Sequence, residues 1–138
     1  MSPTGVIAFQ AYLSRDSNGP LSAHHILKFD VVPLNRGSRY NVFDGIFIVP
    51  SSGTYVFTWS IMCDPNGRVT TELMKNAEVI GTRIADSVSS TVWDFSTGIS
   101  VTDVIQGDQV YVRLAESSRG LVKSHPLSRT SFSGWLLR

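Results

Sequence analysis

The residues best suited to chemistry lie in one polar segment near the C-terminus, residues 116–129. It carries Arg119, Lys123, His125 and Arg129 among several serine hydroxyls. Guanidinium and ammonium groups bind carboxylates, sulfates and phosphates, and an arginine can hold a carboxylate through two parallel hydrogen bonds. The segment therefore predicts a site for an anionic group of a glycan. The alternative is a solvated loop whose charges keep the protein soluble.

The sequence offers no catalytic constellation. It has three histidines and one cysteine, and it lacks the HExxH, GxSxG and CxxC patterns. His24 and His25 are adjacent, so in a strand their rings would point to opposite faces and would not readily bind one metal ion. We expect a binding protein that is not an enzyme.

Trp93 is the aromatic residue whose role the sequence leaves open. It borders a polar segment, where an indole can stack on a sugar ring. It also begins an alternation with Phe95, Ile99 and Val101 that is typical of a core or a subunit contact. Both interpretations remain open at this point.

Strands must position these residues. Residues 53–63 and 91–101 alternate between apolar and polar side chains, and residues 6–13 and 46–49 are nearly continuous apolar runs. Turn residues separate the runs, and Asn66-Gly67 is a strong hairpin signal. No stretch has a convincing helical period. Short, regularly spaced strands of this kind predict an all-β sandwich or jelly roll.

Size and composition fit one ordinary globular domain. The chain has 138 residues, 17% of them charged, and a net charge of +1, which gives no argument for binding nucleic acid. No apolar run is long enough for a membrane span. Residues 1–5 lack a basic start and a hydrophobic segment, so we assign them to a tail and residues 6–138 to the domain. The chain is either leaderless or a mature form with an added start Met.

Cys63 is the single cysteine, so it has no partner for an internal disulfide. It ends an apolar strand pattern, which favours a small buried side chain. The alternative is an intermolecular bridge.

One spaced series of residues identifies the scaffold. Its members are Phe29, Asn35, Tyr40, Phe47, Gly53 and Tyr55, and blocks 6–11, 107–112 and 131–137 flank them in order. This series resembles the signature of the C1q globular domain, across about residues 6 to 137. The block 56–59 and the ending 131–135 look closest to the short, collagen-less C1q-domain proteins of molluscs.

The resemblance implies a ten-strand, two-sheet jelly roll of the C1q/TNF-like type, assembled as a homotrimer. The expected strands are 6–13, 24–25, 28–33, 39–42, 46–49, 53–63, 68–76, 91–101, 108–115 and 130–137. With both termini at one end, we expect the loops at 50–53, 77–92 and 116–129 to gather at the other. Phe9, Phe47 and Leu137 are expected at the threefold contact, because their strands are apolar on both faces.

The resemblance also implies a calcium site. Several C1q-domain proteins bind calcium near the trimer apex through two loop aspartates, and Asp86 and Asp94 stand eight residues apart in the corresponding segment. Loop carboxylates, hydroxyls and carbonyls are the hard oxygens that calcium prefers. The alternative is that Asp86 caps a turn and Asp94 faces solvent.

The expected function follows from the same family. It is a secreted pattern-recognition lectin of innate immunity that binds sialic acid or microbial glycans, such as lipopolysaccharide, through apical loops. Arg119, Lys123, His125, Arg129 and Trp93 would contact the sugar. No cofactor is required, apart from the calcium that Asp86 and Asp94 would hold. The alternative is a trimeric protein ligand that binds a receptor or bridges extracellular proteins.

Overall fold

The computed structural model describes residues 5–37 and 39–138, so the tail assigned to residues 1–5 lies almost entirely outside the described residues. The described residues form strands, turns and bends but no helix. The strands are β1 (Ala8–Tyr12), β2 (Val31–Arg36), β3 (Tyr40–Asn41), β4 (Ile46–Ile48), β5 (Gly53–Cys63), β6 (Arg68–Lys75), β7 (Glu78–Asp86), β8 (Asp94–Val104), β9 (Gln109–Leu114), β10 (Val122–Lys123) and β11 (Ser131–Leu136).

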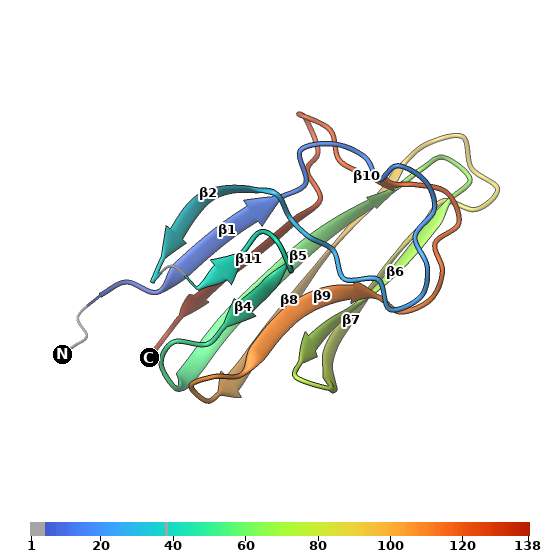
Figure 1. Cartoon of the computed structure of the whole chain (residues 1–138). Coiled ribbons are helices and arrows are strands. Elements are labelled where there is room, and N and C mark those ends of the chain that lie inside the picture. Colours follow the sequence, from blue (N-terminus) through green and yellow to red (C-terminus); the bar gives the residue numbers. More distant parts are fainter. Residues whose placement is uncertain (1–4, 38) are drawn as a thin grey trace.

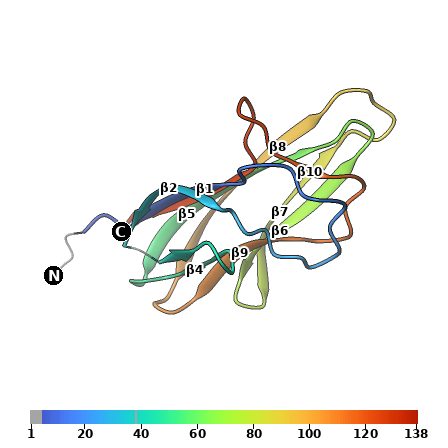
Figure 2. The ribbon, with the colours of Figure 1, turned by 45° about the horizontal axis from the view of Figure 1, so that its top comes forward.

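Two antiparallel sheets pack face to face (Figures 1 and 2), as the sequence predicts. The six-stranded sheet runs β10-β5-β11-β1-β2, with β8 on the other edge of β5. The five-stranded sheet runs β3-β4-β9-β6-β7. Strand β5 has neighbours on both sides in the first sheet. Strand β8 pairs with one edge along its whole length, and β11 and β10 share the opposite edge.

The core lies between the sheets and is rich in aromatic rings. On β5 the inward residues Tyr55, Phe57, Trp59 and Ile61 are buried, which confirms the period-two alternation read from the sequence. Trp59 donates its indole N–H to Thr71 Oγ1 of the facing sheet at 2.9 Å. That hydrogen bond satisfies the one polar group of a fully buried indole.

Phe9 and Phe47 belong to this core. Both side chains are almost completely buried within the protomer, and their rings stack with centroids 4.6 Å apart. A side chain buried inside one protomer cannot also reach across a subunit contact, so the assignment of these two residues to the threefold contact is wrong. The facing sheet covers the inward side of β1 and β4, whereas Gln10 on the outward side of β1 is exposed. Leu137 is exposed and stays available for a contact.

A group of exposed apolar side chains lies instead on the outer face of the six-stranded sheet. Phe95, Ile99 and Val101 project outward from β8, and Trp135 projects from β11. Val56 of β5 connects them, because it pairs with both Val101 and Trp135. Ile99 is 67% exposed and Val101 is 60% exposed. Such contiguous apolar surface usually marks an interaction site.

The strands of the structure differ from the predicted ranges in several places. Strand β7 was expected to be part of a loop over 77–92, whereas it pairs with β6 along most of its length. The predicted strand at 24–25 is absent, because His24 adopts a positive φ of 67° and only Ile26 makes an isolated bridge. Strand β10 was not predicted, and the structure has eleven strands in its described residues where ten were expected.

The position of the loop at 50–53 also differs from the expectation. Thr54 donates its backbone N–H to the carbonyl oxygen of Arg138 at 3.2 Å, and Leu137 donates to Thr54 at 2.8 Å. The loop therefore lies beside the C-terminus and not at the far end. The segments 87–93 and 115–130 do lie at the end opposite the termini (Figure 1).

Cys63 is buried at the end of β5, and burial raises the pKa of its thiol. An intermolecular disulfide would require the strand end to open. Of the described residues, none forms a helix that is both long and apolar enough to span a bilayer.

Candidate functional site

The end of the sandwich opposite the termini, which we call the loop end, forms around the last residues of β5, where β8 and β10 pair with it. Cys63, the last residue of β5, pairs with Asp94 at the start of β8 on one side and with Val122 of β10 on the other. The strands therefore place the segment before β8 and the segment around β10 side by side. Residues far apart in sequence meet at this point.

Trp93, Lys123 and His125 form one cluster at this end, and we call it the Trp93 cluster. The indole ring of Trp93 lies 5.9 Å from the imidazole of His125, measured between ring centroids. The Lys123 ammonium lies 5.8 Å from the centroid of the Trp93 ring, within the range of a cation–π contact. Trp93 is 49% exposed, so much of its surface remains free to bind a ligand.

The hairpin that carries His125 is closed by two backbone hydrogen bonds. His125 and Ser128 each donate an N–H to the carbonyl oxygen of the other, at 3.0 and 2.8 Å. His125 Nδ1 accepts the N–H of Leu127 at 3.1 Å, which fixes the ring toward its own turn. Leu127 sits at the tip of this hairpin and is 89% exposed.

Lys123 is held by two carboxylates. Its ammonium lies 2.9 Å from Asp16 Oδ2 and 3.8 Å from Asp64 Oδ1. The hydrogen bond to Asp16 raises the pKa of Lys123, and the negative charges of Asp16 and Asp64 reinforce the effect. Lys123 therefore keeps its charge, but the two acids offset part of the attraction that it would exert on an anionic ligand.

The two predicted arginines do not join the Trp93 cluster. Arg119 donates from Nε to the carbonyl oxygen of Asn66 at 2.9 Å, so it secures the β5–β6 hairpin. Arg129 places its guanidinium 4.6 Å from the centroid of the Tyr12 ring and donates to the backbone carbonyl of Ser14. Both guanidinium groups therefore already have partners within the protomer, and neither is part of the Trp93 cluster.

Asp86 and Asp94 lie close together but are occupied. Asp94 Oδ2 accepts the backbone N–H of Asp86 at 2.8 Å. Asp86 accepts the N–H of Val88 at 3.0 Å and pairs with Arg68 at 3.3 Å. The hydrogen bond from Val88, helped by Arg68, lowers the pKa of Asp86 against a small opposing effect of burial.

These contacts do not amount to a calcium shell. The Arg68 guanidinium occupies the position beside Asp86 where a cation would sit, and calcium takes six to eight oxygen ligands. Within residues 5–37 and 39–138, no group of three or more His, Cys, Asp or Glu side chains is arranged to hold a metal ion. Calcium binding at Asp86 and Asp94 stays a prediction.

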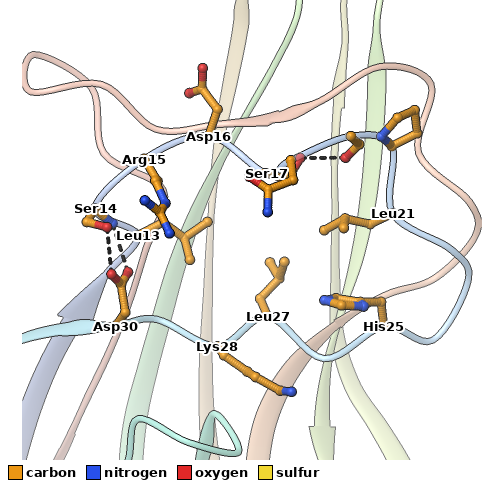
Figure 3. Close-up of a pocket in the computed structure, with 13 residues that line it drawn as sticks. Leu13, Ser14, Arg15, Asp16, Ser17, Leu21, His25, Leu27, Lys28 and Asp30 are labelled. Carbon is orange, nitrogen blue, oxygen red and sulfur yellow. Dashed lines mark hydrogen bonds between the residues drawn. The ribbon is translucent and has the colours of Figure 1, made fainter.

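The sequence did not reveal a cavity formed by the segment between β1 and β2. Its volume is about 600 Å³, and residues 13–21 form one wall while 25–30 form the other (Figure 3). Leu13, Leu21 and Leu27 give it an apolar lining. The turn residues Asn18-Gly19-Pro20 were the one available signal, because they predict that the chain reverses there.

Comparison with known proteins identifies the family. The model of the C1q domain matches residues 8–137, nearly the whole chain. The chain belongs to the C1q domain family. Its β-sandwich superposes on the globular domain of zebrafish complement 1qA protein with a TM-score of 0.68, at 18% identity, covering 96% of this chain and 98% of that one. At that identity the likeness shows a shared fold.

One further solved structure and one curated protein are similar to this chain. The Eiger TNF structure from S. frugiperda has a TM-score of 0.65 and 17% identity, over 97% of this chain and 94% of that one. Caprin-2 of Danio rerio is 29% identical over 133 residues, which are 95% of this chain and 14% of Caprin-2. This C1q domain therefore corresponds to a small part of Caprin-2.

The signature residues of this C1q domain are structural. Asn35 donates its side-chain amide to the carbonyl of Tyr40 at 3.0 Å and accepts the Tyr40 N–H at 3.2 Å. The Tyr40 hydroxyl donates to the carbonyl of Phe29 at 2.9 Å. Tyr55 donates its hydroxyl to the carbonyl of Ser51 at 2.7 Å. These contacts close the loops around the core and leave ligand binding to other residues.

Proposed function

We propose that this C1q domain is an extracellular, homotrimeric recognition protein that binds glycans at its loop end, without catalysis. The observation that carries the proposal is the Trp93 cluster, in which an indole half exposed to solvent is flanked by Lys123 and His125. An exposed, well-supported aromatic ring beside polar groups is suited to hold a ligand that has an apolar face and a polar edge.

A sugar ring has that shape. Its C–H face can stack on the Trp93 indole, while its hydroxyls reach the imidazole of His125 and the ammonium of Lys123. Because Asp16 and Asp64 offset part of the Lys123 charge, stacking supplies more of the affinity than attraction to an anion. We therefore expect glycans that end in sialic acid, or microbial glycans, to bind weakly at each single site.

Trimer formation would make such weak sites effective. The outer face of the six-stranded sheet, with Ile99, Val101 and Trp135, supplies the apolar surface for contact between protomers. Closed cyclic symmetry buries the same face of each copy, and stable interfaces cover about 1,600 Å². Three Trp93 clusters on one trimer could then engage a repetitive glycan surface together, which raises the overall affinity by multivalency.

A receptor or other extracellular protein is the second candidate ligand. The observation in its favour is that Leu127 and Val92, which flank the Trp93 cluster in sequence, are both strongly exposed. Exposed apolar side chains that lie near one another commonly mark a site of protein interaction. A protein ligand would cover the hairpin tip, whereas a sugar would need only the indole face.

Binding to a broad glycan array, once in calcium and once in chelator, tests the proposal. The proposal expects glycan signal that millimolar monosaccharide competes away. Signal that disappears in chelator would support calcium at Asp86 and Asp94, and signal that survives would show that glycan binding does not need calcium. A blank array in both conditions, from protein of confirmed trimeric mass, would refute the glycan proposal and favour the protein ligand.

A further inference from the structure

The cavity formed by residues 13–30, the segment that connects β1 to β2, has the features of a second ligand site. Its volume of about 600 Å³ falls within the usual range of small-molecule pockets, about 300–1,000 Å³. Figure 3 shows Leu21, Leu27 and His25 directed toward its middle, with Leu13 beside them. An apolar lining with a few polar groups is the usual composition of such pockets.

The acidic groups around this cavity are already bound. Asp30 accepts both the backbone N–H and the hydroxyl of Ser14, at 2.9 and 2.6 Å. These bonds, with the nearby charge of Arg15, lower the pKa of Asp30 although burial opposes them. Asp16 points away from the cavity (Figure 3) and binds Lys123 at 2.9 Å. Both carboxylates are therefore held by contacts within the protomer, and Asp30 keeps its negative charge near Arg15.

The cations of the cavity are less constrained. Arg15 and Lys28 are exposed, and in the described part of the chain neither lies within 4.0 Å of a carboxylate oxygen. Arg15 enters the cavity from the 13–21 wall, and Lys28 extends along the opposite wall (Figure 3). With Asp16 paired to Lys123, the two cations Arg15 and Lys28 outweigh the one carboxylate of Asp30, so the net charge beside the apolar lining is positive.

We propose that this cavity binds a small organic anion in which one carboxylate is attached to an apolar body. Arg15 and Lys28 supply the cations that attract the carboxylate, and the planar fork of Arg15 suits its two oxygens. Leu13 and Leu21, which are partly buried, contact the apolar body, while the buried Leu27 contributes to the wall of the cavity. The site does not include the Trp93 cluster, so it stands whether or not the protein binds glycans.

Titration of the uniformly ¹⁵N-labelled full chain, followed by NMR, tests this site. The probes are octanoate, 4-phenylbutyrate and indole-3-acetate, each compared with its neutral amide. The expected result is that at least one carboxylate shifts the amide signals of residues 13–30 and that its amide binds about tenfold more weakly, as one charge-assisted hydrogen bond implies. Equal binding of acid and amide would overturn the role of the cations.

Matched variants locate the site. The change Arg15→Gln combined with Lys28→Gln is expected to weaken carboxylate binding at least about tenfold. Arg36→Gln removes an equally exposed charge on β2, outside the cavity, and is expected to leave binding unchanged. All three side chains are exposed, so the fold should persist. The proposal is overturned if none of the probes shifts residues 13–30, or if the double variant binds as well as the wild type.

Discussion

The indole of Trp93 and the imidazole of His125 lie 5.9 Å apart at the loop end, although one precedes β8 and the other follows β10. Pairing of both strands with the end of β5 produces this contact. The contact therefore depends on the sandwich being intact, and it places the proposed ligand site on loops that the paired strands hold in position. Loops on such scaffolds commonly carry recognition.

The first prediction concerns the trimer. Ile99→Asp places a charge in the middle of the exposed face of β8, and burial of an unpaired charge at a subunit contact is strongly unfavourable. We expect the wild type to sediment as a trimer at micromolar concentration and the variant to sediment as a monomer. Ile84→Asp, on the exposed side of β7 in the other sheet, is the control and should stay trimeric. A monomeric wild type would refute the assembly.

The second prediction concerns the hydrogen bond across the core. Thr71→Val keeps the shape of the side chain but removes the acceptor of the buried Trp59 indole N–H. We expect the free energy of unfolding to fall by about 1–3 kcal/mol, the cost of an unsatisfied buried donor. Thr70→Val, whose hydroxyl contacts Glu116 at the surface, should change it by less than about 0.5 kcal/mol. Denaturant titration distinguishes the two, and equal effects would contradict the assignment.

The third prediction concerns acid stability. Hydrogen bonds from the Ile105 N–H and the Asn76 amide lower the pKa of Asp108 below its ordinary value of 3.8. The pKa values of Asp86 and Asp30 are lowered as well. A lowered folded pKa means that the stabilisation is fully present well above pH 3.8 and is lost as the pH falls through the folded pKa values. Tm should fall most steeply below about pH 4.

Asp108→Asn provides the matched test of that prediction. An amide cannot accept both hydrogen bonds as an ionised carboxylate does, so Tm at pH 7 should fall by a few degrees, ~4 °C. The further fall in acid should be smaller than in the wild type, because one titrating group is gone. A variant with an unchanged acid profile would show that Asp108 contributes nothing to it.

The fourth prediction concerns Cys63. Its side chain is fully buried, and burial raises the pKa of the thiol, so little thiolate forms near neutral pH. We expect an aromatic disulfide reagent to react with Cys63 in the native protein only as fast as the protein unfolds, and at once in denaturant. Non-reducing gels should show no disulfide-linked dimer. Rapid labelling of the folded protein would support the intermolecular bridge.

The sequence predicts the scaffold more fully than the site. The spaced residues from Phe29 to Tyr55 and the alternation in β5 suffice for the two-sheet sandwich. Strand β7 could not be predicted, because it lies at the edge of its sheet and most of its residues are at least partly exposed. Exposed apolar residues such as Val79 and Ile84 therefore give no clear alternation of apolar and polar side chains. Phe9 and Phe47 were misplaced because an apolar strand does not reveal whether a facing sheet or another protomer covers it.

The partners of the polar site residues could not be read from the chain. Lys123 pairs with Asp16, and Arg119 donates to Asn66, through contacts between loops that only the folded topology brings together. Trp93 and His125 were predicted as ligand residues, and the structure places them in one cluster with Lys123. The cavity of residues 13–30 has no sequence pattern of its own, since it depends on how two irregular segments face each other.

The fifth prediction addresses the central proposal, and it compares two exposed aromatic residues. Trp93→Ala should remove binding to the best glycan of an array, because stacking supplies most of the affinity, while circular dichroism and trimer mass stay unchanged. Phe43→Ala removes a strongly exposed ring from the β3–β4 turn and should bind as the wild type does. The measurement is the apparent Kd of each trimer for that immobilised glycan. Loss of at least about tenfold in affinity for Trp93→Ala alone is the predicted result. Unchanged affinity in that variant would contradict glycan binding at the Trp93 cluster.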